Sequence, residues 1–158
     1  MPYNKLKTLT QLKKTLKSPA LKHKKTVFTN GCFDLMHVGH VSYLNKARSL
    51  GDLLIIGLNS DSSVKKLKGS KKPITSQRDR AKVLGALECV DFVTIFKGST
   101  PYDLIKNIKP SVLVKGGDWK VKDIVGSGFV RSYGGIVKSL PYIKGYSTKN
   151  IIKKIKSV

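Results

Sequence analysis

Short apolar runs alternate along the chain with longer stretches in which apolar residues recur every three or four positions. The first pattern indicates β-strands and the second indicates amphipathic helices. The run at 53–58 is apolar throughout, as expected for a strand that is buried on both faces of a parallel sheet. The predicted strands are 26–30, 53–58, 92–96, 111–115 and 135–140. The predicted helices are 8–17, 38–50, 62–67, 77–87, 100–108, 126–133 and a last one that begins after Ser147.

Strands that alternate with helices predict an α/β fold with a doubly wound, parallel, five-stranded sheet. We expect one domain over residues 25–158, preceded by an N-terminal helical extension over 1–24. Polar residues gather directly after three of the strands, at 30–40, 59–61 and 115–119. Because ligands bind beyond the carboxyl ends of the strands in such sheets, we expect these three segments to line one site.

The length and composition of the chain narrow the class of protein. Its 158 residues fit a single domain with a substantial core, and 40% hydrophobic and 25% charged residues are ordinary for a globular protein. No apolar run approaches the roughly 20 residues that span a bilayer, and the first residues lack the apolar core of a signal peptide. Two cysteines give no disulfide framework. We therefore expect a cytoplasmic protein without a membrane partner.

The charge balance is strongly basic, because 31 lysines and arginines against 9 acidic residues give a formal net charge of +22. Such a surface suits nucleic acid, an acidic membrane face or small anionic substrates. Arginine, which reads base edges best, occurs only at positions 48, 78, 80 and 131, and no aromatic residues interleave with the lysines. We expect no specific nucleic-acid partner, only weak and salt-sensitive binding as a side effect.

The run TNGCFDLMHVGH, at 29–40, carries the most informative chemistry. It follows a predicted strand and leads into a predicted helix, so that His37 and His40 fall side by side on the first helical turn. Free backbone N–H groups and the positive end of the helix dipole favour a phosphate there. Gly39 leaves the backbone open to close approach by a base or a phosphate. This arrangement predicts a nucleotide site.

Paired histidines are also typical of zinc sites, which usually need a third protein ligand. The remaining histidine, His23, lies in a lysine-rich segment, and Cys32 and Cys89 form no Cys-x-x-Cys pair. We therefore expect no protein-bound metal, and we interpret both cysteines as small packed residues.

Five segments together resemble a known family. They are 29–44, 59–69 (NSDSSVKKLKG), 80–91 (RAKVLGALECVD), 113–119 (LVKGGDW) and 147–155 (STKNIIKKI). The histidine motif resembles the signature of the nucleotidyltransferase superfamily, and the whole set is similar to the bacterial heptose 1-phosphate adenylyltransferases. The resemblance implies a Rossmann-like nucleotidyltransferase fold. It also implies that ATP and D-glycero-D-manno-heptose 1-phosphate give ADP-heptose and pyrophosphate, for lipopolysaccharide biosynthesis, with Mg²⁺ bound to the ATP.

The resemblance further implies the roles of individual residues. Catalysis is assigned to His37, His40 and Lys68, which would align the reacting phosphates and neutralise their charge. The residues expected to bind the nucleotide are Asn30, Gly31, Cys32, Phe33, Gly39, Lys65, Lys115, Gly116, Gly117, Asp118, Ser147 and Thr148. The chain departs from the family's pattern at Lys72, Ile143, Lys144 and Lys149.

Several residues have a structural alternative to a functional role. They are Lys65, Lys68, Arg80, Trp119, Ser147 and Thr148. The lysines either clamp phosphates or are solvated surface groups, and the arginine either reaches a phosphate or braces its helix. The tryptophan either stacks on a ligand or covers the pocket, and the two hydroxyls either donate to the β- or γ-phosphate or cap a helix. Asp34 is expected to fix its own turn by accepting backbone hydrogen bonds.

Two rival functions stay open at this point. One is a cytidylyltransferase for glycerol 3-phosphate or a related alcohol phosphate, and the other, of a different class, is a basic nucleic-acid-binding module. An aminoacyl-tRNA synthetase fragment shares the histidine motif, but the chain is too short to include an anticodon-binding region. The expected partners are ATP and a sugar 1-phosphate, and the leading helix could serve a homodimer.

Overall fold

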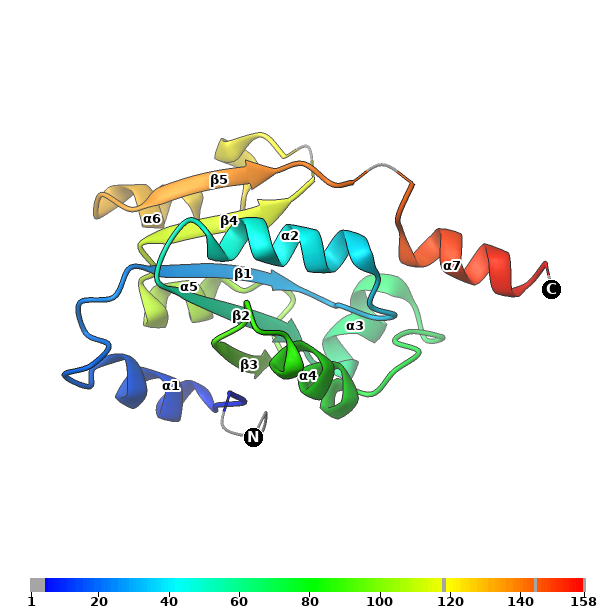
Figure 1. Ribbon diagram of the computed structural model, residues 1–158, viewed down its shortest axis with the longest axis horizontal. Helices are drawn as coiled ribbons and strands as arrows, with labels where there is room; N and C mark the ends of the chain where they lie inside the picture. Colours follow the sequence, from blue (N-terminus) through cyan, green and yellow to red (C-terminus); the bar gives the residue numbers. More distant parts are fainter. Residues whose placement is uncertain (1–4, 118, 144, 158) are drawn as a thin grey trace.

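The computed structural model describes residues 5–117, 119–143 and 145–157, so Asp118 and Lys144 lie outside the described residues. Five parallel strands form one sheet in the order β3-β2-β1-β4-β5, with helices on both faces (Figure 1). The strands are β1 (Thr26–Gly31), β2 (Leu53–Asn59), β3 (Phe92–Phe96), β4 (Val112–Gly116) and β5 (Ile136–Leu140). The helices are α1 (Leu9–Leu16), α2 (Val38–Arg48), α3 (Asp61–Lys68), α4 (Gln77–Ala86), α5 (Tyr102–Ile108), α6 (Ser127–Ser132) and α7 (Thr148–Ile155), with a 3-10 turn, η2, at Val121–Asp123.

Two hydrophobic clusters lie on the two faces of the sheet. On one face α2 and α4 pack over Val27, and on the other α1, α5 and α6 pack around Phe28. Adjacent residues of a strand point to opposite faces, which is why neighbours on β1 belong to different clusters. Every residue of β2 is buried, as the apolar run at 53–58 predicted. Helices on both faces of a parallel five-stranded sheet confirm the predicted fold class.

The segment before β1 packs against the sheet. A capping box begins α1, in which Thr8 and Gln11 exchange hydrogen bonds between side chain and backbone. Leu12 on this helix is fully buried in the cluster around Phe28. The backbone just before α1 pairs with the edge strand β3, through a 2.9 Å bond from the Lys7 N–H to the Val93 carbonyl. Residues 5–16 therefore pack against the sheet, with Leu12 as their buried residue.

On α2 the buried face is formed by Tyr43, Leu44 and Ala47, whereas Val41 is only half-buried. A phenol can be buried here because its hydroxyl shares a 2.7 Å hydrogen bond with the hydroxyl of Thr29 on β1. The ends of the predicted helices and strands differ from the observed ones by at most two residues.

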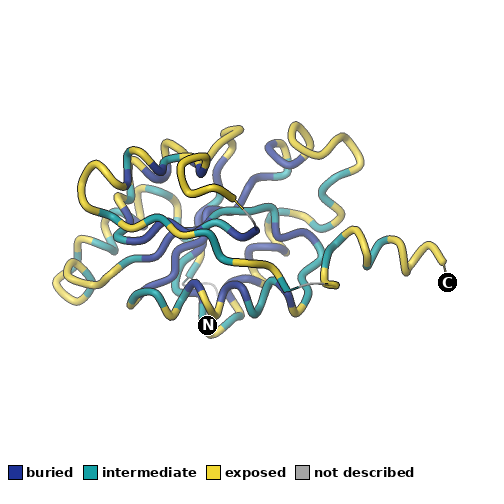
Figure 2. Tube along the Cα trace, turned by 90° about the horizontal axis from the view of Figure 1, so that it is seen from above, coloured by how far each residue is buried: buried dark blue, intermediate teal, exposed yellow. Residues whose placement is uncertain are grey.

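The last helix, α7, extends away from the sheet and is exposed along much of its length (Figures 1 and 2). Ser147 caps it as predicted, and its side chain accepts a hydrogen bond from the Asn150 N–H. No residue of α7 is buried, and Ile155 is 65% exposed. The strands β1, β2, β3 and β4, in contrast, contain most of the buried residues at the centre of the molecule (Figure 2).

Candidate functional site

The loop between β1 and α2 is held by a buried carboxylate. Asp34 accepts hydrogen bonds from the backbone N–H groups of Ile74 (2.8 Å) and Thr75 (3.0 Å) and from the Thr75 hydroxyl (2.9 Å). Burial alone would raise the pKa of Asp34, but these hydrogen bonds lower it overall. The expectation that Asp34 fixes its own turn is therefore wrong in one respect. The backbone that it binds lies about 40 residues further along the chain, before α4.

Arg80 on α4 is a second buried brace, 2% exposed. Its guanidinium donates to the carbonyl of Cys32, to the carbonyl of Thr75 (3.1 Å) and to the carboxylate of Asp61 (2.8 Å). These three acceptors lie on the β1–α2 loop, the segment before α4 and the start of α3. Of the two roles left open for Arg80, the structure supports the bracing role.

The two histidines of the motif contact each other at the start of α2. His40 lies in the first turn of the helix, but His37 is its N-cap residue, in extended backbone, and thus just outside the first turn where it was predicted. The ring centroids are 3.9 Å apart, and among the described residues neither Nδ1 atom has a hydrogen-bond partner. Burial, with smaller contributions from the neighbouring His37 and Lys68, lowers the pKa of His40 to about 4. Burial also lowers the pKa of His37.

Gly39 makes room for the histidine ring, and this corrects its predicted role. A Cβ at this position would lie 3.0 Å from Cε1 and Nδ1 of His37 and 3.2 Å from the Cβ of Tyr146. The space over this glycine is therefore filled by protein side chains. The backbone there is not open to a base or a phosphate.

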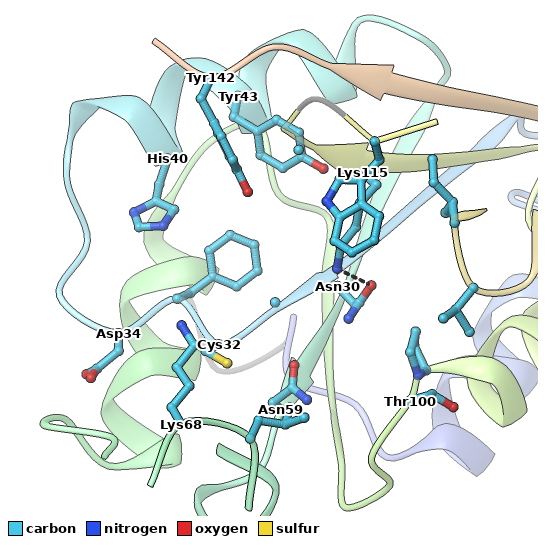
Figure 3. A pocket seen from close by; sticks show the side chains of 18 of the residues that line it. Asn30, Cys32, Asp34, His40, Tyr43, Asn59, Lys68, Thr100, Lys115 and Tyr142 are labelled. Carbon is cyan, nitrogen blue, oxygen red and sulfur yellow. Dashed lines mark hydrogen bonds between the residues drawn. The ribbon is translucent and has the colours of Figure 1, made fainter. Parts of the chain in front are cut away.

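A pocket of about 450 Å³ opens at the carboxyl ends of the strands (Figure 3). The predicted site residues that line it are Asn30, Gly31, Cys32, Phe33, His40, Lys68, Lys115, Gly116 and Thr148. Five further predicted residues are described but do not line it: His37, Gly39, Lys65, Gly117 and Ser147. Asp118 lies outside the described residues. The three polar segments that follow β1, β2 and β4 all contribute to this wall, as their position after parallel strands predicted.

Two lysines give the middle of the pocket its positive charge. Lys115 is half-buried at the end of β4, and its ammonium donates a 3.3 Å hydrogen bond to Oδ1 of Asn30. Burial lowers the pKa of Lys115, and the neighbouring Lys68 lowers it further. Lys68, at the end of α3, reaches the pocket, whereas the exposed Lys65 one turn earlier does not. An anionic ligand between the two lysines would relieve their mutual repulsion.

Two tyrosine side chains, which were not predicted from the sequence, close one end of the pocket. Tyr142, in the segment after β5, and Tyr43, on α2, both line it. A Cβ on Gly116 would lie 2.7 Å from Cε1 of Tyr142 and 3.1 Å from Cε2 of Tyr43, so only glycine fits there. The next residue, Gly117, has a φ of +106°, a left-handed backbone conformation that favours glycine whatever the space around it. Trp119 also lines the pocket and is 50% exposed.

Both hydroxyls at the start of α7 have protein partners. Ser147 caps the helix, as described above, and the Thr148 hydroxyl donates a 2.9 Å hydrogen bond to the carbonyl of Asp34. The second bond joins α7 to the loop that precedes the histidines, across 114 positions of sequence. Contact of these hydroxyls with phosphate stays a prediction.

Two features are not found among the described residues. No group of three or more His, Cys, Asp or Glu side chains is arranged to hold a metal ion. No helix in the described ranges combines the length and the apolar character needed to cross a membrane. The two cysteines, Cys32 and Cys89, are free and half-buried.

The chain matches known proteins over most of its length. The sequence profile described as Cytidylyltransferase-like matches residues 28–154. The Bifunctional protein HldE of Geotalea uraniireducens (strain Rf4) is 52% identical over 153 residues, which cover 97% of this chain and 31% of that protein. The Bifunctional protein HldE of Aliarcobacter butzleri (strain RM4018) is 59% identical over 132 residues, which cover 84% of this chain and 27% of that protein. The chain thus spans about a third of the length of these curated relatives.

Solved structures share the fold. The lipopolysaccharide core biosynthesis protein from Thermoplasma volcanium GSS1 aligns with a TM-score of 0.63 and 26% identity, over 78% of this chain and 99% of that one. Pantoate-beta-alanine ligase from Francisella tularensis, complexed with beta-gamma ATP and beta-alanine, aligns with a TM-score of 0.61 over 97% of this chain and 78% of that one. At 15% identity, this second likeness is one of fold alone.

Proposed function

The chain belongs to the cytidylyltransferase-like family, and on that premise we propose that it joins ATP and D-glycero-D-manno-heptose 1-phosphate into ADP-heptose and pyrophosphate. The observation that carries the proposal is a pocket lined by His40, whose ring contacts that of His37, together with Lys68 and Lys115. Such a pocket suits a polyphosphate chain. The adenylyl and heptose specificity rests on the resemblance in TNGCFD and LVKGGDW, and the likeness to HldE proteins and to a lipopolysaccharide core biosynthesis protein supports it.

In the proposed reaction an oxygen of the sugar 1-phosphate attacks the α-phosphorus of ATP. A bond forms from that oxygen to the α-phosphorus, the bond from the α-phosphorus to the bridging oxygen breaks, and pyrophosphate leaves. The nucleophile is already an anion, so no general base and no covalent intermediate are required. The protein must align the two phosphates and neutralise the charge that moves onto the pyrophosphate.

The histidine pair would supply donors for that charge. Burial keeps the His40 imidazole neutral near pH 7 in the free protein, because its pKa is about 4. A neutral imidazole has one N–H to donate, and a phosphate beside it favours the protonated ring, which has two. His37 contacts His40 and does not line the pocket, so we propose that it acts largely by orienting the His40 ring.

The substrate ATP would carry Mg²⁺ with it. Phosphate oxygens and water would hold most of the ion's coordination sphere, and the ion would neutralise part of the triphosphate charge. Lys68 and Lys115 would neutralise more of that charge as point charges. Asp34 and Arg80 would hold the loop before α2 and the segment before α4 in fixed positions around the phosphates.

Pyrophosphate release across a panel of nucleotides and phosphorylated acceptors tests the proposal. We expect the highest turnover with ATP and a heptose 1-phosphate, and much less with CTP and glycerol 3-phosphate. A clear preference for CTP would assign the chain to another branch of the family. Tight, sequence-selective binding of DNA at physiological salt, without turnover of any pair, would favour the nucleic-acid-binding module instead.

Two further expectations belong to the proposed function. We propose a cytoplasmic location, because the substrate ATP is made there and both cysteines are free. Homodimerisation stays a prediction, and sedimentation velocity of the purified protein tests it.

A further inference from the structure

Asn59 is a buried amide in the wall of the pocket. It is the last residue of β2, it is 3% exposed, and it lies at the end of the pocket away from Tyr142 (Figure 3). Thr100, from the loop after β3, lines the same end. The proposed contacts with the phosphates do not involve this side chain.

A directional chain of hydrogen bonds fixes which way the amide points. The Ser63 hydroxyl donates its single proton to the carbonyl of Gly98, at 2.9 Å. Its oxygen can then only accept, and it accepts from Nδ2 of Asn59, also at 2.9 Å. A flipped amide would set its carbonyl oxygen against the serine oxygen, with no proton between them. Oδ1 of Asn59 is thereby left as an acceptor on the pocket side, and it has no hydrogen-bond partner among the described residues.

The lining of the pocket changes character from one end to the other. Tyr142 lies at one end, the charged groups of Lys68 and Lys115 lie between, and Asn59 and Thr100 lie at the other end (Figure 3). This order of aromatic, cationic and neutral polar groups matches the order of base, phosphates and sugar in a nucleoside diphosphate sugar. A phosphate oxygen would be repelled by Oδ1 of Asn59, because both atoms only accept hydrogen bonds.

We propose that Oδ1 of Asn59 accepts a hydrogen bond from a hydroxyl of the acceptor sugar, and that this end of the pocket binds the sugar of the sugar 1-phosphate. The inference rests on the proposed function and assigns a part of the pocket to its second substrate. Ser63 is a positioning residue in this arrangement, since it holds the amide with its acceptor toward the sugar. A ribose hydroxyl of ATP offers the same chemistry, and the two sources are separated by the kinetics below.

Steady-state kinetics of the full chain test the assignment. Asn59→Ala should raise the KM for the sugar 1-phosphate about tenfold, the usual scale for one lost hydrogen bond, while the KM for ATP stays unchanged. Asn45→Ala, an exposed asparagine on α2, is the matched control and should change neither constant. An increase in the KM for ATP alone would indicate the ribose and overturn the proposal, as would unchanged constants for both substrates.

Deoxy analogues of the sugar 1-phosphate sharpen the test. With wild-type protein, removal of the contacted hydroxyl should raise KM about tenfold, and the same removal should cost Asn59→Ala almost nothing, because the two changes delete one interaction. Equal losses in both proteins for every analogue would overturn the proposal.

A second variant covers the case in which Asn59→Ala does not fold. Ser63→Ala keeps the amide but frees its orientation, so it should raise the KM for the sugar several-fold and leave the KM for ATP unchanged. An unchanged sugar KM in a folded Ser63→Ala protein would overturn the positioning role. The proposed function fails separately, if wild-type protein turns over no sugar 1-phosphate at all.

Discussion

The imidazole rings of His37 and His40 lie with their centroids 3.9 Å apart, and only His40 lines the pocket. The glycine between them allows this contact, because a side chain at position 39 would collide with the His37 ring. We therefore expect the pair to act as one unit. A change at either ring should alter the orientation or the charge of the imidazole that lines the pocket.

His40→Ala should lower kcat by about two orders of magnitude, the loss seen when one preorganised donor is removed from a transition-state site. His37→Ala should lower kcat on a similar scale, because the donor ring of His40 then loses the contact that orients it. The affinity for ATP should fall less than kcat, because the charge to be neutralised develops during displacement. Pyrophosphate release and ATP titration measure the two quantities. A folded double variant with near-normal turnover would remove both residues from the chemistry.

The low pKa of His40 predicts how stability depends on pH. Its pKa is about 4 in the folded protein, against an ordinary value of 6.5, so the unfolded chain takes up this proton first as the pH falls. The contribution of His40 to the free energy of unfolding is therefore complete above pH 6.5 and is lost progressively down to pH 4. Urea unfolding at several pH values should show a shallower decline for His40→Gln than for wild type. Equal slopes would contradict a buried neutral imidazole.

Lys68 and Lys65 form a matched pair on α3. Lys68 lines the pocket and Lys65, one turn earlier, does not. Lys68→Ala should raise the KM for ATP about tenfold or more, the scale of one charge-assisted hydrogen bond, and Lys65→Ala should change it little. The pKa of His40, followed by NMR titration, should also rise in Lys68→Ala, because the lysine disfavours a second positive charge. An effect of equal size for both lysines would indicate a general electrostatic role.

Arg80 should be required for folding stability. Arg80→Met leaves the carbonyls of Cys32 and Thr75 and the carboxylate of Asp61 without their donor, so the free energy of unfolding should fall by about 3 kcal/mol or more. Arg78→Met, at an exposed position of the same helix, is the control and should lie within about 0.5 kcal/mol of wild type. Chemical denaturation measures both. A stable, folded Arg80→Met protein would disprove the bracing role.

We expect Thr→Val to change the free energy of unfolding in opposite directions at two buried threonines. Thr94 on β3 is 1% exposed, and its hydroxyl has no hydrogen-bond partner among the described residues. Thr94→Val should therefore raise the free energy of unfolding by about 1 kcal/mol. Thr29→Val removes a partner of the buried Tyr43 hydroxyl, so it should lower the free energy of unfolding by a similar amount. Denaturation curves of both variants decide, and a shift of the same sign in both would contradict the argument.

The fold could be predicted from the sequence because its signals are local. The fully buried strand is recognisable from the continuous apolar run at 53–58, and the start of the last helix is recognisable from its capping residue Ser147. The gathering of Asn30, Asn59 and Lys115 around one pocket followed from a general property of parallel sheets.

The remaining parts of the site depend on contacts between residues that are far apart in the sequence. Such contacts leave no local sequence pattern. The bond from Thr75 to Asp34 joins residues 41 positions apart, and Tyr142 reaches the pocket from a segment without a motif. Gly39 looked like an opening for a ligand, because the sequence does not indicate that the His37 ring folds back over it. A glycine beside a functional residue can therefore leave room either for a ligand or for a neighbouring protein side chain.

Two different surfaces lie at the two ends of the parallel strands, and this separates residues that engineering can change from those of the pocket. The pocket lies at the carboxyl edge, while the amino ends of β1 and β4 border a groove of about 250 Å³. The lysines that line this groove are Lys13, Lys17, Lys22, Lys24 and Lys109. Because none of them lines the pocket, we expect neutral residues in place of the exposed Lys17 and Lys22 to lower the isoelectric point and leave the pocket unchanged. The same two positions suit a dye or a surface linkage, whereas Lys13 is less suitable because its ammonium donates a 2.9 Å hydrogen bond to Asn107.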